Sequence, residues 1–341
     1  MRKFSLIVAT LGERPFDLWA LLRSLASQAK FIKEVIVVDQ HSDPIYIPAL
    51  LNPFMDVLPI VHTRSKRGLS RARNHGLSFV TGDFVAFPDD DCMYPDGLLE
   101  WVADWFESNL EYDILAVGAN DSEGLMSGNR WFQQSCEIKP VNAFRTTFSS
   151  SLFLLSELAR SSRFDEQLGL GSGTPFGSGE ETDYVLRLLR MRARGRFDRT
   201  RHIVHPRHDM LSENTTSQRA LAYGVGMGHV LRINSLRVIW AGFLTYNLAR
   251  AGIAALRGSF KGAHLCVAQT LGMWKGFLAP TAAQATTHSY TGGSRSSRLS
   301  LVNNSSPQIS HVVSERSSHA PSVIHDSDLE ELRDEAGSAL S

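Results

Sequence analysis

The chain has 341 residues, of which 43% are hydrophobic, and its 35 Lys and Arg balance its 35 Asp and Glu. This length suggests one large or two smaller domains with a sizeable core. A neutral chain differs from dedicated nucleic-acid binders, which carry a basic excess, so we expect no nucleic-acid partner for the chain as a whole. The cysteines Cys92, Cys136 and Cys266 lack metal-ligand spacing and form no disulfide framework, which favours a reducing, cytoplasmic compartment.

Charge and composition divide the chain into three parts. Residues 214–280 contain no Asp or Glu, although they contain seven Lys or Arg. From residue 281 onward the chain is rich in Ser, Thr, His and Gly and shows no core-forming periodicity. We therefore predict a folded body at 1–213, a basic region of amphipathic helices at 214–280, and a disordered Ser-rich tail at 281–341.

The first elements form a strand–helix–strand unit. The apolar run Phe4–Thr10 is typical of a strand buried on both faces, and it is too short for a targeting segment. Leucines recur at helical spacing over 17–30, and a second β-branched run covers 34–39. A right-handed crossover brings both strand ends to one edge of the sheet, where open α/β sheets bind ligands. Residues 10–14 and 39–43 are therefore predicted to line one crevice.

A second unit follows in chain order. We expect a strand at 57–63, a helix that begins after Gly68, a strand at 83–87, and a helix that begins near Pro95 and includes Phe106. Alternating strands and helices predict an α/β fold, with a mostly parallel mixed sheet flanked by helices.

Three carboxylates follow the strand at 83–87. Along an extended chain Asp89 and Asp91 point to one side and Asp90 to the other. Two carboxylates on one side suit a hard divalent cation such as Mg²⁺ or Mn²⁺, often shared with substrate phosphates. The alternative is a turn or helix cap, where Asp is frequent.

An ordered series of motifs now resembles a known family. The motifs are Thr10–Arg14, Val38–Asp43, Gly68–Asn74, Phe87–Asp91, Phe164–Gly169 and Gly177–Tyr184. Together they resemble the family 2 glycosyltransferases, inverting enzymes with the GT-A fold, of the bacterial polysaccharide type. The resemblance covers the first 210 or so residues, and an ordered series is far more specific than any one motif. It implies that 1–213 is a GT-A catalytic domain.

The resemblance implies roles for individual residues. A sugar-nucleotide donor would be bound by the side chains of Thr10, Glu13, Arg14, Asp39, Arg71, Arg73, Asn74 and Asp89. The metal, Mn²⁺ or Mg²⁺, would be held directly by Asp91, with Asp89 close by. His205 is similar to the histidine that completes this site in several family members, and it fits that position better than His202 or His208.

A second acidic cluster begins a predicted helix after a glycine-rich loop. Acidic residues in a first turn favour the helix dipole, and Asp183 with Arg187 has i,i+4 spacing. This structural explanation accounts for Asp183 but not for Glu180 and Glu181. A carboxylate can act as the base that takes the proton of an acceptor hydroxyl. The family usually has Glu-Asp here, so the resemblance places the base at Glu181 and leaves Glu180 as the alternative.

The basic region is apolar but interrupted by Arg and Lys. Helical stretches at 217–232, 236–256 and 264–278 carry Trp240 and Trp274. The longest uncharged part of the second stretch is shorter than the roughly 20 residues that a spanning helix needs. Such composition suits an anionic membrane surface, so we expect a peripheral protein at the inner face of the cell membrane. Packing on the body or another subunit, RNA binding and a true span are the alternatives.

The leading hypothesis is an inverting, metal-assisted transfer of a hexosyl or deoxyhexosyl group from a nucleotide-sugar donor to a hydroxyl of a glycan or lipid-linked acceptor. One alternative is a sugar-nucleotide nucleotidyltransferase, but its glycine-rich first loop with Lys-Pro is not found at 10–15. The other is a non-catalytic membrane-associated adaptor, which the carboxylates of Asp39, Asp89, Asp91 and Glu181 argue against. The sequence makes no prediction of the oligomeric state.

Overall fold

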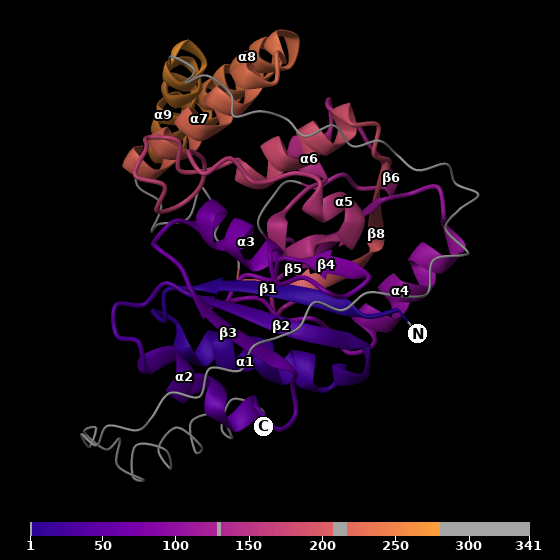
Figure 1. The fold of residues 1–341 in the computed structure, drawn as a ribbon. Coiled ribbons are helices and arrows are strands. Elements are labelled where there is room, and N and C mark those ends of the chain that lie inside the picture. The colour runs from indigo at the N-terminus through magenta and orange to yellow at the C-terminus, as the bar shows by residue number, and fades with distance from the viewer. Residues whose placement is uncertain (1, 128–130, 207–216, 280–341) are drawn as a thin grey trace. The chain divides into compact units, whose positions relative to one another are not determined.

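The computed structural model describes residues 2–127, 131–206 and 217–279, and within them the strands form one mixed sheet (Figure 1). The strand order is β3-β2-β1-β4-β7-β5-β8-β6. The strands are β1 (Phe4–Thr10), β2 (Ile32–Asp39), β3 (Ile60–Arg64), β4 (Phe84–Ala86), β5 (Ile114–Asn120), β6 (Cys136–Ile138), β7 (Leu152–Leu155) and β8 (Gly195–Val204). The predicted domain boundaries at 213 and 280 and the predicted tail lie outside the described residues.

Helices flank the sheet and continue beyond it. They are α1 (Pro15–Ala26), α2 (Tyr46–Leu51), α3 (Leu69–Leu77), α4 (Leu98–Ser108), α5 (Ser156–Arg160), α6 (Glu180–Arg190), α7 (Ser217–Ile233), α8 (Arg237–Leu256) and α9 (Phe260–Leu278). Short 3₁₀ turns lie at Ala29–Phe31, Asn52–Phe54, Ala143–Arg145 and Ser149–Ser151. Boundaries differ from the predictions by a few residues: the first helix ends at Ala26, and α4 starts at Leu98. None of the described helices is long and apolar enough to cross a bilayer.

The topology brings the ends of the first strands to one edge. β1 pairs in parallel with β2 and β4, and β2 pairs in parallel with β3. The chain moves outward from β1 to β3 and then returns to β4, so right-handed crossovers put α1 and α2 on one face and α3 on the other (Figure 1). The mixed character comes from β7, which is antiparallel to β4 and β5, and from β6, which is antiparallel to β8.

The core confirms the apolar patterns of the first unit. The four leucines of α1 predicted to share a face, Leu18, Leu21, Leu22 and Leu25, are fully buried. Val35–Val38 of β2 are also fully buried, as expected for a strand covered on both faces. This buried scaffold fixes the loops that follow β1, β2 and β4.

Glycines bring two helices of the basic region into backbone contact. A β-carbon added at Gly228 of α7 would lie 2.1 Å from the carbonyl oxygen of Met273, and one at Gly276 of α9 would lie 1.9 Å from that of Val225. Gly224 meets Gln269 in the same way. Later positions on α7 meet later positions on α9, so the two helices run in the same direction. This close packing explains why both helices tolerate glycine, which weakens an isolated helix.

Helix α7 also packs on the folded body. The Ser178 hydroxyl donates to the carbonyl oxygen of Tyr223 at 3.1 Å, and the ring of Phe176 stacks on His229 with centroids 3.7 Å apart. At the end of α7, the Asn234 amide donates to the carboxylate of Asp183 at 2.9 Å. The helix therefore supports both the glycine-rich loop and the start of α6.

We expect Gly276→Ala to destabilise the fold by about 1–3 kcal/mol, because the new methyl group would overlap the backbone of α7. Urea unfolding would measure the change. Gly242→Ala is the matched control, since the space around Gly242 of α8 is open. There alanine should stabilise the helix by up to about 1 kcal/mol. Equal effects of the two substitutions would contradict the close packing of α7 and α9.

Candidate functional site

The loops after β1, β2 and β4 meet through hydrogen bonds. Thr10 and Asp39 are partners in the ladder between β1 and β2, and the backbone N–H of Gln40 donates to the carbonyl oxygen of Thr10 at 3.0 Å. The Thr10 hydroxyl donates to the Asp90 carboxylate at 2.7 Å. The residues predicted to line one crevice therefore do lie together at the carboxyl edge of the sheet.

Asp39 is a fully buried carboxylate at the end of β2. One oxygen accepts the backbone N–H of His41 at 2.7 Å. The other oxygen lies 3.2 Å from His62 Nε2 and 3.4 Å from Arg64 Nε. His62 and Arg64, both on β3, were not among the predicted site residues. Their positions tie Asp39 to the neighbouring strand.

The three carboxylates after β4 have different sets of partners. Asp90 bonds Thr10 and also forms an ion pair with Arg14. Arg14 spans to Asp91 as well, so its guanidinium lies between the two acidic side chains. Arg14 and the neighbouring Glu13 are both exposed.

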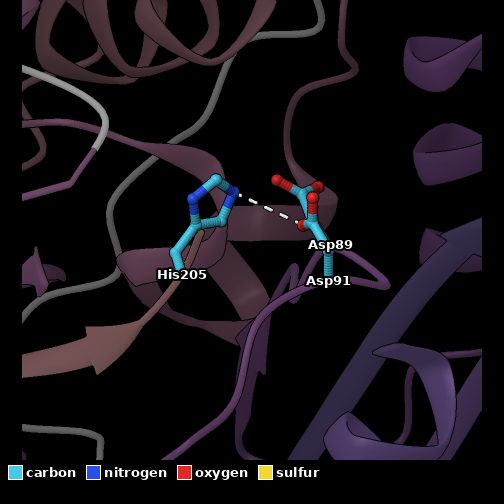
Figure 2. Close-up of side chains that lie close together, drawn as sticks. All are labelled: Asp89, Asp91 and His205. Carbon is cyan, nitrogen blue, oxygen red and sulfur yellow. Dashed lines mark ion pairs between the residues drawn. The ribbon is translucent and has the colours of Figure 1, made fainter. Parts of the chain in front are cut away.

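Asp89 and Asp91 form a group with His205, which follows β8. Each of the three offers one ligand atom, and these atoms all lie within 4.8 Å of one another (Figure 2). His205 Nε2 is 3.4 Å from Asp91 Oδ1. These residues are far apart in the sequence, and the parallel pairing of β8 with β5 carries His205 to the carboxylates.

The state of His205 suits a metal ligand. Its Nδ1 lies 2.7 Å from the carbonyl oxygen of Pro206, so Nδ1 carries the proton and donates there. Burial lowers the pKa of His205, although the charge of Asp89 opposes that shift. A neutral ring therefore presents the Nε2 lone pair to the carboxylates (Figure 2). Two carboxylates and one imidazole are a donor set that fits a divalent cation.

Arg73 of α3 connects this group to the second acidic cluster. Its side chain is almost fully buried and donates to Asp89 at 2.9 Å and to Glu180 at 3.1 Å. Burial opposes the charged form, but the two carboxylates outweigh it and raise the pKa of Arg73. Burial likewise raises the pKa of Asp89, yet Arg73 and the hydroxyl of Ser150 together bring that pKa below its usual value. Both groups therefore stay charged.

The start of α6 presents two adjacent glutamates in different environments. The helix follows Gly179, which has a positive φ of 88°. Glu180 pairs with Arg73. Burial, and then the nearby charge of Glu180, raise the pKa of Glu181 to about 8. Glu181 is thus the carboxyl group here that gains and loses a proton near neutral pH.

Arg71 and Asn74 do not join this group. Arg71 forms an ion pair with Glu166 at 3.1 Å. The amide of Asn74 donates to the carbonyl oxygen of Phe164 at 2.9 Å and accepts the Phe164 N–H at 2.7 Å. Their contacts fasten the segment before the glycine-rich loop and give no support to the predicted donor-binding role. His202 lies on β8 outside the group, and His208 lies outside the described residues.

Two serines that were not among the predicted site residues also lie against Asp89. The Ser150 hydroxyl donates to Asp89 Oδ2 at 2.6 Å, and that of Ser149 lies 3.4 Å from the same oxygen. The run Ser149–Ser151 before the apolar β7 was the available signal, since such runs often mark turns that offer hydroxyl donors.

The chain is similar to known proteins in sequence and in fold. Residues 5–162 match the family model described as Glycosyl transferase family 2. A mouse polypeptide N-acetylgalactosaminyltransferase 4 is 37% identical over 101 residues, which cover 28% of this chain and 18% of that protein. An uncharacterized glycosyltransferase of Haemophilus influenzae is 26% identical over 184 residues, which cover 54% of this chain and 61% of that protein.

A solved structure shares the fold. The structure of S. aureus TarS residues 1–349 in complex with UDP-GlcNAc superposes with a TM-score of 0.50 at 18% identity, over 80% of this chain and 89% of that one. The sheet, its flanking helices and this likeness define a GT-A fold. The chain spans less than two thirds of the length of the curated relatives it matches.

We expect Arg73→Met to destabilise the fold by about 3–5 kcal/mol, because it leaves the buried Glu180 and the partly buried Asp89 without their cation. Arg71→Met is the matched control on the same helix. It removes a largely exposed ion pair with Glu166 and should cost no more than about 1 kcal/mol. Chemical denaturation of both variants measures the difference in the free energy of unfolding. Similar losses of stability in the two variants would contradict the predicted contribution of the Arg73 ion pairs.

Proposed function

We propose that the protein is an inverting glycosyltransferase, which transfers a sugar from a nucleoside-diphosphate sugar to a hydroxyl group. The observation that carries the proposal is the Asp89–Asp91–His205 group joined through Arg73 to the glutamates that begin α6. The family model that residues 5–162 match and the names of the relatives support the same reaction class.

The donor would lie along the carboxyl edge of the sheet. Asp39 at the end of β2 would face the nucleoside, while the loop with Arg14 would face the diphosphate. This placement is supported by the bonds that connect Thr10, Asp39 and Asp90. The complex of TarS with UDP-GlcNAc, a protein with the same fold, is consistent with a nucleotide-sugar donor here.

A divalent cation, Mn²⁺ or Mg²⁺, would be held by Asp91 and His205, with Asp89 beside it. When bound, such an ion neutralises negative charge on the diphosphate of the leaving group. Asp89 already bonds Arg73 and Ser150, which suits a group that orients the site more than a direct ligand. This division between Asp91 and Asp89 agrees with the one that the family resemblance implies.

Glu181 would act as the base. Its carboxylate would accept the proton of the acceptor hydroxyl as that oxygen attacks the anomeric carbon, and the bond from this carbon to the diphosphate oxygen would break in the same step. One displacement inverts the anomeric centre. Glu180 is the weaker candidate because Arg73 already binds it, and a base works best with a pKa near the operating pH.

The acceptor would be a glycan or a lipid-linked glycan, in polysaccharide biosynthesis at the inner face of the cell membrane. The basic, acid-free region beside the glycine-rich loop supports this placement, since α7 contacts that loop through Ser178 and Phe176.

We expect Asp91→Asn to weaken Mn²⁺ binding by about tenfold or more, and donor turnover should fall with it. Titration calorimetry or the electron paramagnetic resonance of free Mn²⁺ measures binding without relying on activity. Asp90→Asn is the matched control, because Asp90 lies in the same triplet but bonds Thr10 and Arg14. Unchanged Mn²⁺ affinity in Asp91→Asn would remove the metal role.

The pH profile tests the base. Below pH 8 we expect kcat/KM to rise about tenfold per pH unit and then to level off, because the base acts only when deprotonated and its pKa is about 8. Glu180→Gln removes the nearby charge that raises this pKa, so the rising limb should move to lower pH.

Glu181→Gln should bind donor yet lose transfer. Loss of transfer in Glu180→Gln, with a normal profile in Glu181→Gln, would assign the base to Glu180 instead.

A further inference from the structure

The outer side of α8 carries no charge. Its inner side packs on α9, where Trp240 donates to the carbonyl oxygen of Met273 at 3.3 Å and Asn247 and Ala251 are buried. The residues on the opposite half of the helix are Val238, Ala241, Gly242, Thr245, Tyr246, Leu248, Ala249, Gly252, Ile253 and Leu256, all exposed. Val238 and Leu256 are 86% and 90% exposed. A helix on a soluble body normally turns its charged side outward, so this arrangement is inverted.

Helix α9 carries a second row of exposed apolar side chains. Val267, Leu271, Trp274 and Leu278 follow one another at spacings of three and four, and each is at least 40% exposed. Phe260, at the start of α9, is 77% exposed. The ring of Trp274 lies 5.2 Å from that of Trp240 on α8, so aromatic contact joins the two helices. We call these residues of α9 and the outer side of α8 the outer face.

The charges around the outer face all have one sign. Arg237 is the first residue of α8, Arg257 follows its last residue, Lys261 and Lys275 lie on α9, and all four are exposed. Residues 217–279 contain no Asp or Glu to balance them. The outer face therefore combines exposed aliphatic and aromatic side chains with a rim of cations.

We propose that the outer face of α8 and α9 inserts into the headgroup region of a bilayer that contains anionic lipid. Aliphatic side chains and Trp274 would enter the boundary of the acyl chains, and the Arg and Lys rim would contact lipid phosphates. This inference deepens the proposed function by naming the surface and its partner. It rests on the proposed membrane placement and on no catalytic residue.

Charge and shape favour lipid over other occupants. A second copy of the chain would bring the two basic rims together without acidic partners from these helices. A surface that binds RNA would offer mainly cations and stacking rings, whereas most of the exposed side chains here are aliphatic. Insertion in the plane of the surface also agrees with helices that do not reach the length and apolarity of a span.

Sedimentation of the full chain with vesicles tests the proposal. The protein should bind vesicles of phosphatidylcholine with phosphatidylglycerol and bind pure phosphatidylcholine more weakly. The double variant Leu256→Gln with Phe260→Gln should lower binding by about tenfold or more. Both side chains are exposed, so the variant should fold normally. Arg257→Gln with Lys261→Gln should remove the preference for anionic lipid and its sensitivity to salt.

The matched control is Leu110→Gln with Val141→Gln, which removes two exposed apolar side chains, 63% and 67% exposed, outside α8 and α9. It should bind vesicles like the parent protein. A parent protein that stays in solution with both vesicle types overturns the proposal, as does normal binding by the Leu256, Phe260 variant. A dimer or an RNA complex that depends on these two residues, without vesicle binding, also overturns it.

Donor hydrolysis without vesicles separates this proposal from the proposed function. The Leu256, Phe260 variant should hydrolyse donor at the parent rate. Vesicle binding without any donor turnover would leave the outer face established and the glycosyltransferase reaction refuted.

Discussion

The buried guanidinium of Arg73 is the constraint on which the site depends. It lies between Asp89, which follows β4, and Glu180, which begins α6, and it is almost fully withdrawn from water. Taking three charges out of water is costly, and their mutual attraction offsets that cost only while the geometry holds. The guanidinium therefore fixes the spacing between the Asp89–Asp91–His205 group and the helix that carries Glu181. It also pairs with Glu180, and burial together with the charge of Glu180 raises the pKa of the neighbouring Glu181.

Strands and helices were predictable where the apolar pattern of the sequence matches the burial of the residues in the structure. β1 and β2 are long β-branched runs covered on both faces, and α1 carries its leucines at helical spacing. β6 and β7 were missed because each has only three or four residues and no alternation. The antiparallel placement of β7 between β4 and β5 depends on pairing with distant segments, which no local pattern records.

The site was predictable from strand ends and less so from helices. Asp89 and Asp91 follow a buried strand, and topology alone brings them to the ligand-binding edge. Asn74 shared a motif with Arg73, yet helical geometry turns the two side chains in different directions, and Asn74 fastens the segment at Phe164 instead. Ser150 lies 61 positions from Asp89 in the chain, so its contact appears only in three dimensions.

The parallel contact between α7 and α9 limits how the chain can be shortened. Because these helices run in the same direction, α8 must return along the whole bundle before α9 can pack on α7. A truncation after α8 would strip the partner from the glycines of α7, the same helix that supports the loop ahead of Glu181 through Ser178 and Phe176. A fragment cut at the end of the sheet would thus lose the helix that supports the candidate site.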